Sequence, residues 1–273
     1  MRNFVRNALA VGVAIAGLAV PASATHSWGG YHWARTSNPF TLKLGDNVDG
    51  SWDSYLVTTS ADWTASAVLN TVIVPGTVKQ ARRCGATTGR VEVCNAAYGN
   101  TGWLGIASIS IVSGNHISSG TVKQNDTYFN TAQYNSPTWR NMVMCQEVGH
   151  TLGLDHQDEA FDNANLNTCM DYTNNPSSNQ HPNQHDYDML ATIYNHADST
   201  TTLGQTVNRF GRQSTGLVSG ESGLTMKTWG RPVHFTRDGR PDKFVRIDGP
   251  GMLTVTHVFW VPGKGPRDNR VSE

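Results

Sequence analysis

Charged side chains are scarce in this sequence, since Asp, Glu, Lys and Arg make up only 15% of its 273 residues. The two signs also cancel, with 21 basic and 21 acidic residues, and no basic stripe stands out along the chain. Proteins that bind a phosphate backbone or an anionic membrane surface rely on such a stripe. We therefore expect no nucleic acid and no membrane surface as a partner. The hydrophobic fraction of 38% is also low, which favours a neutral, loop-rich, soluble protein over a helical bundle.

Long apolar runs are lacking as well, with one exception at the N-terminus. Arg2 and Arg6 precede an apolar run over residues 8–20, which is too short to span a bilayer comfortably. Residues 22–24, Ala-Ser-Ala, then fit the small-residue rule for signal-peptide cleavage. We therefore expect residues 1–24 to be a secretory signal peptide, a mature chain that starts at Thr25, and an extracellular protein. An uncleaved anchor is the alternative.

Cysteine is used sparingly, and the number of cysteines is even. The four residues are Cys84, Cys94, Cys145 and Cys169, and they can pair in three ways. We favour Cys84–Cys94, which closes a short loop, together with Cys145–Cys169. Such bridges persist in the oxidising environment outside the cell. Free buried thiols are the alternative.

The spacing of apolar residues predicts alternating strands and helices in the first two thirds of the chain. Strands are expected at residues 39–44, 68–74, 90–94, 103–112 and 116–125, and a helix at about 52–66. A second helix should begin with Ser136 as its N-cap and Pro137 in its first position, and should end at Gly153. Residues 155–185 are polar and aperiodic, which is typical of a functional loop. A closing helix follows at 185–196.

The pattern of residues in the sequence changes beyond residue 197, where a linker-like stretch replaces the alternating strands and helices. The length of the chain allows one large domain, or a medium domain followed by a small one. We expect the main domain over residues 25–197 and a linker over residues 198–228. Residues 229–273 alternate around Gly-containing turns, which predicts a small β-rich C-terminal extension.

One cluster of residues carries clear chemistry. Glu147, His150, Gly153 and His156 follow the spacing E-x-x-H-x-x-G-x-x-H. Positions 146 and 150 lie one helical turn apart and share a face. Gly153 allows the chain to leave the helix in a conformation that other residues resist, so that His156 can return to the same point. Imidazoles are normal zinc ligands, and Glu147 beside them can take a proton from a zinc-bound water.

The stretch 146–156, QEVGHTLGLDH, resembles the metzincin signature H-E-x-x-H-x-x-G-x-x-H, which a Met-turn follows. Residues 168–172, TCMDY, look like that turn, with Met170 beneath the metal. Tyr172 matches the tyrosine that astacin-like and serralysin-like members place near the zinc. The order of expected elements over residues 39–195 is also similar to that of matrixin-like members. The resemblance implies an α/β fold with a twisted mixed sheet, an active-site helix and a Met-turn, and the small C-terminal β extension predicted from the alternation pattern would follow it.

The same resemblance implies a secreted zinc endopeptidase, which we expect to be a monomer that acts on proteins or peptides. Glu147 would be the general base and proton donor, and Tyr172 would help to stabilise the oxyanion. In such folds a strand next to the active site binds extended substrate by edge pairing. Residues 103–110, WLGIASIS, are our candidate for that strand.

The sequence departs from the signature at its first position, where Gln146 replaces histidine. An amide oxygen is a poorer zinc donor than an imidazole nitrogen, and three interpretations follow. Gln146 is a true third ligand; or another side chain replaces it, with His181 and His185 as the nearest candidates; or the site is a relic that no longer cleaves peptides. The retained Glu147 argues against decay, because a relic has no use for a base.

Further features leave alternatives open. A Cys145–Cys169 bridge would tie the active-site helix to the Met-turn, and Asp158 could orient His156. Calcium is a second candidate metal, and four acidic residues could bind it: Asp155, Asp158, Asp162 and Asp171. Their spacing, however, matches no calcium-binding motif that we trust. The competing functional class is a catalytically inactive secreted binding module that keeps the scaffold. A weaker alternative is an envelope protein whose metal only stabilises the fold.

Overall fold

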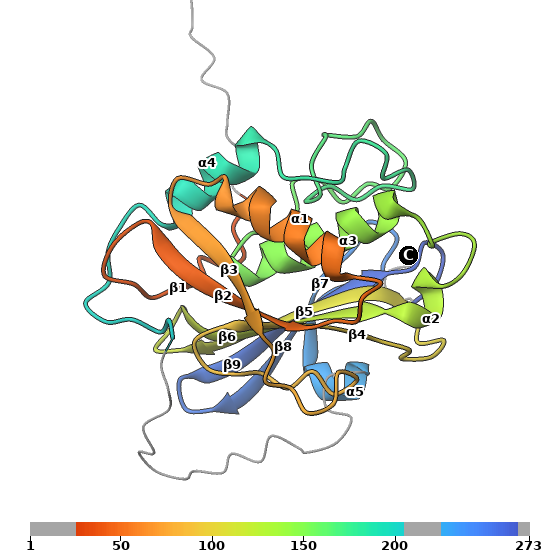
Figure 1. Ribbon diagram of the computed structural model, residues 1–273. Coiled ribbons are helices and arrows are strands. Elements are labelled where there is room, and N and C mark those ends of the chain that lie inside the picture. The colour runs from red at the N-terminus through yellow and green to blue at the C-terminus, as the bar shows by residue number, and fades with distance from the viewer. Residues whose placement is uncertain (1–25, 205–224, 267–273) are drawn as a thin grey trace, which may run out of the picture.

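The computed structural model describes residues 26–204 and 225–266 (Figure 1). The expected signal peptide and most of the expected linker lie outside the described residues. Within the described ranges, no helix is long and apolar enough to cross a membrane.

A mixed sheet forms the centre of the fold. Its path over the described residues runs β3-β2-β4-β6-β5-β9-β8-β7, and β1 pairs with β6 off this path. The parallel part joins β2, β3, β4 and β6, whereas β5, β9, β8 and β7 are each antiparallel to their neighbours. In chain order the strands are β1 (His32–Trp33), β2 (Phe40–Asn47), β3 (Leu69–Pro75), β4 (Val91–Ala96), β5 (Trp103–Val112), β6 (His116–Asn125), β7 (Arg231–Phe235), β8 (Pro241–Gly249) and β9 (Met252–Trp260).

Helices cover one face of this sheet. Helix α1 (Asp53–Thr64) is the crossover that parallel strands β2 and β3 require. It lies beside α3 (Pro137–Thr151), and α4 (Gln184–Ile193) lies above both (Figure 1). As the sequence predicts, Ser136 caps the N-terminus of α3, since its hydroxyl accepts a hydrogen bond from the backbone N–H of Trp139. Pro137 lies in the first turn of the helix. The short helices α2 (Asp126–Phe129) and α5 (Met226–Trp229) were not predicted.

The core has two parts, one on each face of the sheet. The main core lies between the sheet and helices α1 and α3. A second, aromatic-rich cluster comprises Tyr98, Trp103, Ile106, Trp229, Phe244, Val258 and Trp260. Strand β9 contributes to both, because Val255 and Phe259 belong to the main core while Val258 and Trp260 belong to the second. The C-terminal strands therefore continue the central sheet and share its core.

Residues 103–110, which we predicted to bind extended substrate by edge pairing, have no free edge in this structure. Strand β5 pairs with β6 on one side and with β9 on the other, in a register that runs from Trp103↔Trp260 to Val112↔Met252. Alternation along a strand identifies its buried face but says nothing about which strand will pair with it. A peptide can therefore reach this edge only by displacing β9.

Two disulfides connect the four cysteines, and no cysteine is free. The pairs are Cys84–Cys94 and Cys145–Cys169, which is the pairing favoured on sequence grounds. The second bridge joins α3 to the irregular loop that contains Met170. It therefore fastens the helix that carries the motif to the segment that follows it.

Candidate metal centre

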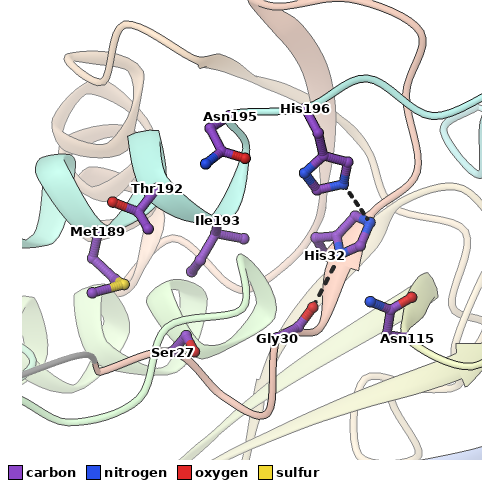
Figure 2. A pocket seen from close by; sticks show the side chains of 9 residues that line it. All are labelled: Ser27, Gly30, His32, Asn115, Met189, Thr192, Ile193, Asn195 and His196. Carbon is purple, nitrogen blue, oxygen red and sulfur yellow. Dashed lines mark hydrogen bonds between the residues drawn. The ribbon is translucent and has the colours of Figure 1, made fainter.

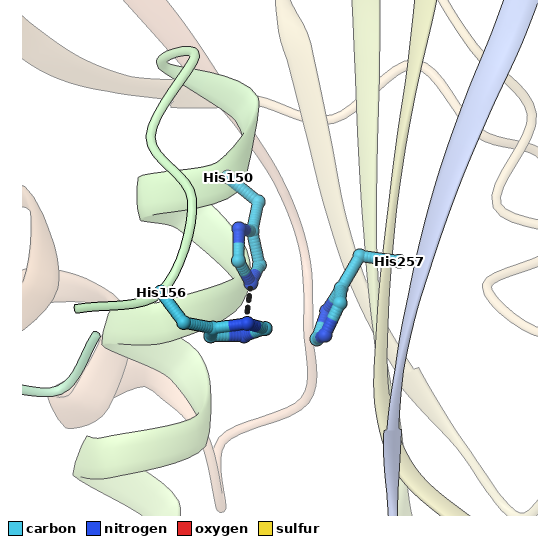
Figure 3. A group of neighbouring side chains, drawn as sticks. All are labelled: His150, His156 and His257. Atoms are coloured by element: carbon cyan, nitrogen blue, oxygen red, sulfur yellow. Dashed lines mark hydrogen bonds between the residues drawn. The ribbon is translucent and has the colours of Figure 1, made fainter. Parts of the chain in front are cut away.

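The motif residues lie in and just after the buried second half of α3. The helix leaves its last turn at Gly153, whose φ is +96°, and a Cβ there would come within 2.1 Å of the Tyr31 carbonyl oxygen. Glycine is therefore required both for the backbone conformation and for the close approach. The turn returns the chain towards the helix, and the Nε2 atoms of His150 and His156 lie 3.1 Å apart (Figure 3).

The outer nitrogens of these two rings are held by acceptors. Nδ1 of His150 donates to the Leu154 carbonyl at 2.9 Å. Nδ1 of His156 lies 3.3 Å from Oε1 of Glu159, which takes the role expected for Asp158. The Asp158 carboxylate instead accepts from Ala160 and Asn163. Because both Nδ1 atoms face acceptors, both Nε2 atoms present lone pairs in the neutral tautomers, which is the arrangement of metal-binding histidines.

A third imidazole completes the cluster and comes from the C-terminal strand β9. The ring of His257 lies with its centroid 4.0 Å from that of His150 and 4.7 Å from that of His156 (Figure 3). One possible ligand atom from each of the three rings lies within 4.8 Å of the others. Both His150 and His257 are fully buried. Burial, followed by the neighbouring imidazoles, lowers the pKa of both rings well below the usual value, so that they stay neutral.

Sequence reasoning missed His257. The available signal was a polar residue in the buried phase of an apolar strand, because Val255, His257 and Phe259 alternate along LTVTHVFWV. A histidine flanked in this way is more often a packed core residue, and its sequence distance from the motif hides the connection.

Glu147 lies at the same point, between α3 and β5. Its Oε2 is 3.3 Å from Nδ1 of His257, and its Oε1 has no hydrogen-bond partner among the described residues. Burial raises the pKa of this carboxyl well above its usual value, against the effect of a hydrogen bond with the Ala107 backbone. Gly105 on β5 provides the space, because a Cβ there would lie 2.7 Å from Oε1 of Glu147.

Tyr172 closes the other side of the cluster. Its hydroxyl lies 2.8 Å from Nε2 of His257, and its ring lies 4.2 Å from that of His156. Burial, followed by the charge of Asp242, raises the pKa of this phenol well above its usual value, so that it stays protonated and can donate. His257 therefore contacts Glu147 through one ring nitrogen and Tyr172 through the other.

The remaining predicted residues lie close to or away from the centre. The Gln146 amide nitrogen donates to the Cys169 carbonyl at 2.7 Å, and its Oε1 is buried with no hydrogen-bond partner among the described residues. Met170 packs under the helix, since a Cβ at Gly149 would lie 2.6 Å from its sulfur. His181 and His185 are outside the cluster. His181 pairs with Asp62 at 2.8 Å on the surface, and His185 stacks on His26.

Comparison with known proteins gives only distant likenesses. No family model and no curated protein matches the sequence. Two solved structures of myroilysin are similar at 13% and 14% identity, with TM-scores of 0.35 and 0.34, over 59% and 60% of this chain and 82% and 86% of theirs. High choriolytic enzyme 1, a hatching enzyme zinc-protease from Oryzias latipes (medaka fish), is similar at 12% identity and a TM-score of 0.34, over 60% of this chain and 94% of that one. Likenesses at this level assign neither a family nor a function, which must come from the residues themselves.

Proposed function

We propose that the chain is a secreted zinc-dependent endopeptidase that its own strand β9 holds in a latent form. The metal would lie on His150 and His156, with Gln146 as the third ligand. The observation that carries the proposal is the position of His257. It stands at once against the two motif imidazoles, the carboxylate of the general base and the hydroxyl of Tyr172.

The residues present fit a divalent cation. Two Nε2 lone pairs that face each other at 3.1 Å repel unless a cation or a proton lies between them. On the same helix as His150, Oε1 of Gln146 and Oε1 of Glu147 are buried acceptors without a hydrogen-bond partner among the described residues. Leaving such atoms unsatisfied costs about 1–3 kcal/mol each, and a metal ion with its bound water would satisfy them. Two imidazoles and an amide oxygen make three protein ligands and leave a fourth position open, which is typical of catalytic zinc.

The chain's own groups then supply acid–base chemistry. Zinc, when bound, would activate a water and polarise the scissile carbonyl. Glu147 would accept a proton from that water and deliver it to the leaving amine. A carboxyl whose pKa burial raises is well suited to this exchange near neutral pH. The protonated hydroxyl of Tyr172 would donate a hydrogen bond to the oxyanion.

Strand β9 blocks each of these steps in the present conformation. The ring of His257 occupies the space between Glu147 and Tyr172 in which a water and a carbonyl oxygen would react. The same strand also fills the edge of β5 that an extended peptide would use. Latency therefore has two physical components, an occupied reaction position and an occupied binding edge.

A second candidate function rests on the same histidine. If His257 were the permanent third ligand, its ring would stay between Glu147 and Tyr172, and the protein would be a non-catalytic binding module. The observation in its favour is that imidazole is the better zinc donor, while Gln146 already uses its amide nitrogen on the Cys169 carbonyl.

One experiment separates the two functions. A specific protease site is introduced between residues 204 and 225, the folded zinc-loaded protein is cut there, and the fragment with β7–β9 is removed in mild denaturant and dialysed away. The product is called the released form below. Zinc content and hydrolysis of casein and a peptide library are measured before and after release, with and without a chelator.

We expect the released form to keep its zinc and to gain chelator-sensitive hydrolysis that the intact chain lacks. A released form that is folded but loses its zinc would identify His257 as the permanent ligand. A released form that keeps zinc and cleaves nothing would also reject the peptidase. Intact Gln146→Ala and His257→Ala variants give the direct comparison, because only the true third ligand should be needed for full zinc occupancy.

A further inference from the structure

A second group of histidines shares no residue with the candidate metal centre. It contains His32 on β1, His116 at the start of β6, and His196 and Asp198 in the segment that follows α4. The three segments that carry these residues are far apart in sequence, and only the fold brings them together. We propose that this group, here called the rim cluster, is a structural zinc site.

The carboxylate of Asp198 lies close to all three imidazoles, and the possible ligand atoms of His32, His116 and Asp198 lie within 4.8 Å of one another. Oδ1 of Asp198 lies 3.5 Å from Nε2 of His32, 3.3 Å from Nε2 of His116 and 3.6 Å from Nε2 of His196. The Nε2 atoms of His32 and His196 are 3.2 Å apart (Figure 2). Ligand atoms about 2.0–2.1 Å from a tetrahedral zinc are about 3.3 Å from one another. Four of the six distances between ligand atoms in the rim cluster are therefore already close to those that a bound zinc ion would impose.

The surrounding hydrogen bonds prepare these atoms for a metal. Nδ1 of His32 donates to the Gly30 carbonyl at 3.0 Å, so its Nε2 presents a lone pair in the neutral ring (Figure 2). Oδ2 of Asp198 accepts from the Arg35 backbone at 3.1 Å and from the Arg35 guanidinium at 2.8 Å. Its Oδ1 is thereby directed at the imidazoles. Partners of this kind orient metal ligands and fix their tautomers.

The position of the cluster allows an ion to enter. The side chains of His32 and Asp198 are 5% and 11% exposed, whereas those of His116 and His196 are 23% and 42% exposed. His32 and His196 also line a surface pocket together with Ser27, Asn115, Met189 and Ile193 (Figure 2). The inner ligands are therefore held rigidly, and the outer two can close on the metal from the solvent side.

The ligand set selects the metal and its role. Three imidazoles and one carboxylate suit zinc, whereas calcium prefers six or more oxygen ligands. Four protein ligands leave no open position, and a closed tetrahedral site is structural. The ion would pin β1 and the segment after α4 to the start of β6. It would thereby also steady the N-terminal segment in which Trp28 packs against His150, with ring centroids 5.2 Å apart.

The test is the zinc stoichiometry of the full mature chain, measured after loading with zinc alone and removing excess ion. His116→Ala and His196→Asn are the main variants, because both side chains are partly exposed and their loss should leave the fold intact. His181→Ala is the matched control, since His181 also pairs with a carboxylate at the surface but belongs to neither cluster. Circular dichroism verifies folding, and His150→Ala reports separately on the candidate metal centre.

We expect two zinc ions per wild-type chain and per His181→Ala chain, and one in His116→Ala and in His196→Asn. Cobalt substitution should give tetrahedral absorption that each rim variant lowers by the share of one ion, and His150→Ala should keep the share that the rim variants lose. The proposal is overturned if folded rim variants bind as much zinc as the wild type. Because it does not depend on the peptidase, one zinc that only the rim variants lose would support it even if the candidate metal centre bound none.

Discussion

The two histidine clusters use the same side chain for different purposes. Beside the buried cluster of His150, His156 and His257 lie a carboxylate oxygen of Glu147 that has no hydrogen-bond partner within residues 26–204 and 225–266, and the protonated phenol of Tyr172. The rim cluster has four potential ligands of its own, and the Arg35 guanidinium beside it donates to the Asp198 carboxylate and so holds that carboxylate in place. An incomplete ligand set beside acid–base groups allows chemistry, whereas a complete set without them supports only structure. The groups around the histidines therefore distinguish the two clusters.

The largest difference between the two clusters should appear when the general base beside the buried cluster is removed. In the released form, Glu147→Gln should lower peptide hydrolysis at least about 100-fold, the scale of a general base, while zinc binding stays the same. Steady-state kinetics and metal analysis together check this. Asp198→Asn is the converse change, and should lower zinc content without altering hydrolysis. Equal activity of Glu147→Gln and the parent would contradict the assignment of the base.

The second prediction concerns the glycines that serve each cluster. Gly153→Ala should destabilise the protein by about 3 kcal/mol or more, because a strained positive φ costs about 1–2 kcal/mol and the clash with the Tyr31 carbonyl adds to it. Gly30, whose carbonyl holds His32, has φ +72° but open space around its Cβ position. Gly30→Ala should therefore show the strain alone, about 1–2 kcal/mol. Urea unfolding of both variants measures the difference, and equal losses would refute the close approach.

The third prediction uses the two disulfides. The Cys145→Ser/Cys169→Ser double variant should lose about 3 kcal/mol of stability and some zinc affinity at the buried cluster, because the bridge fastens α3 to the Met170 loop. The matched control is Cys84→Ser/Cys94→Ser. Its bridge spans 10 residues instead of 24, so chain entropy predicts a loss smaller by about 0.8 kcal/mol. Zinc titration should show no change in that control; a similar loss of affinity in both would argue against a specific link.

The smallest effect is expected at Gly105, which makes room for Glu147. Gly105→Ala should cost about 1–3 kcal/mol through overpacking and should reduce hydrolysis by the released form, because the carboxylate must move. Gly85→Ala is the control, since nothing lies within 4 Å of its Cβ position. Thermal unfolding and kinetics on both variants test this, and an active, unstrained Gly105→Ala protein would show that Glu147 does not need its present place.

Much of the molecule could be predicted from local patterns. The cap at Ser136, the turn at Gly153 and the span of β5 all follow from residues that are near one another in the sequence. The spacing of His150 and His156 is also local, because one helical turn and one bend decide it. The pairing of β5 with β9 could not be predicted, because the alternation of residues along a strand identifies its buried face but does not identify the strand that lies next to it. The orienting partner of His156 also differed from the prediction. The irregular chain after α3 brings Glu159, and not Asp158, to Nδ1 of His156.

The sequence by itself determined the main strands and helices and the pair of motif imidazoles, because helix periodicity and glycine conformation act over a few residues. Only the tertiary structure decided that β9 lies against β5, that His257 joins the motif, and that His32, His116, His196 and Asp198 meet. These contacts join residues that are far apart along the chain. Their free energy comes from packing the whole sheet and core, which no single stretch of sequence contains.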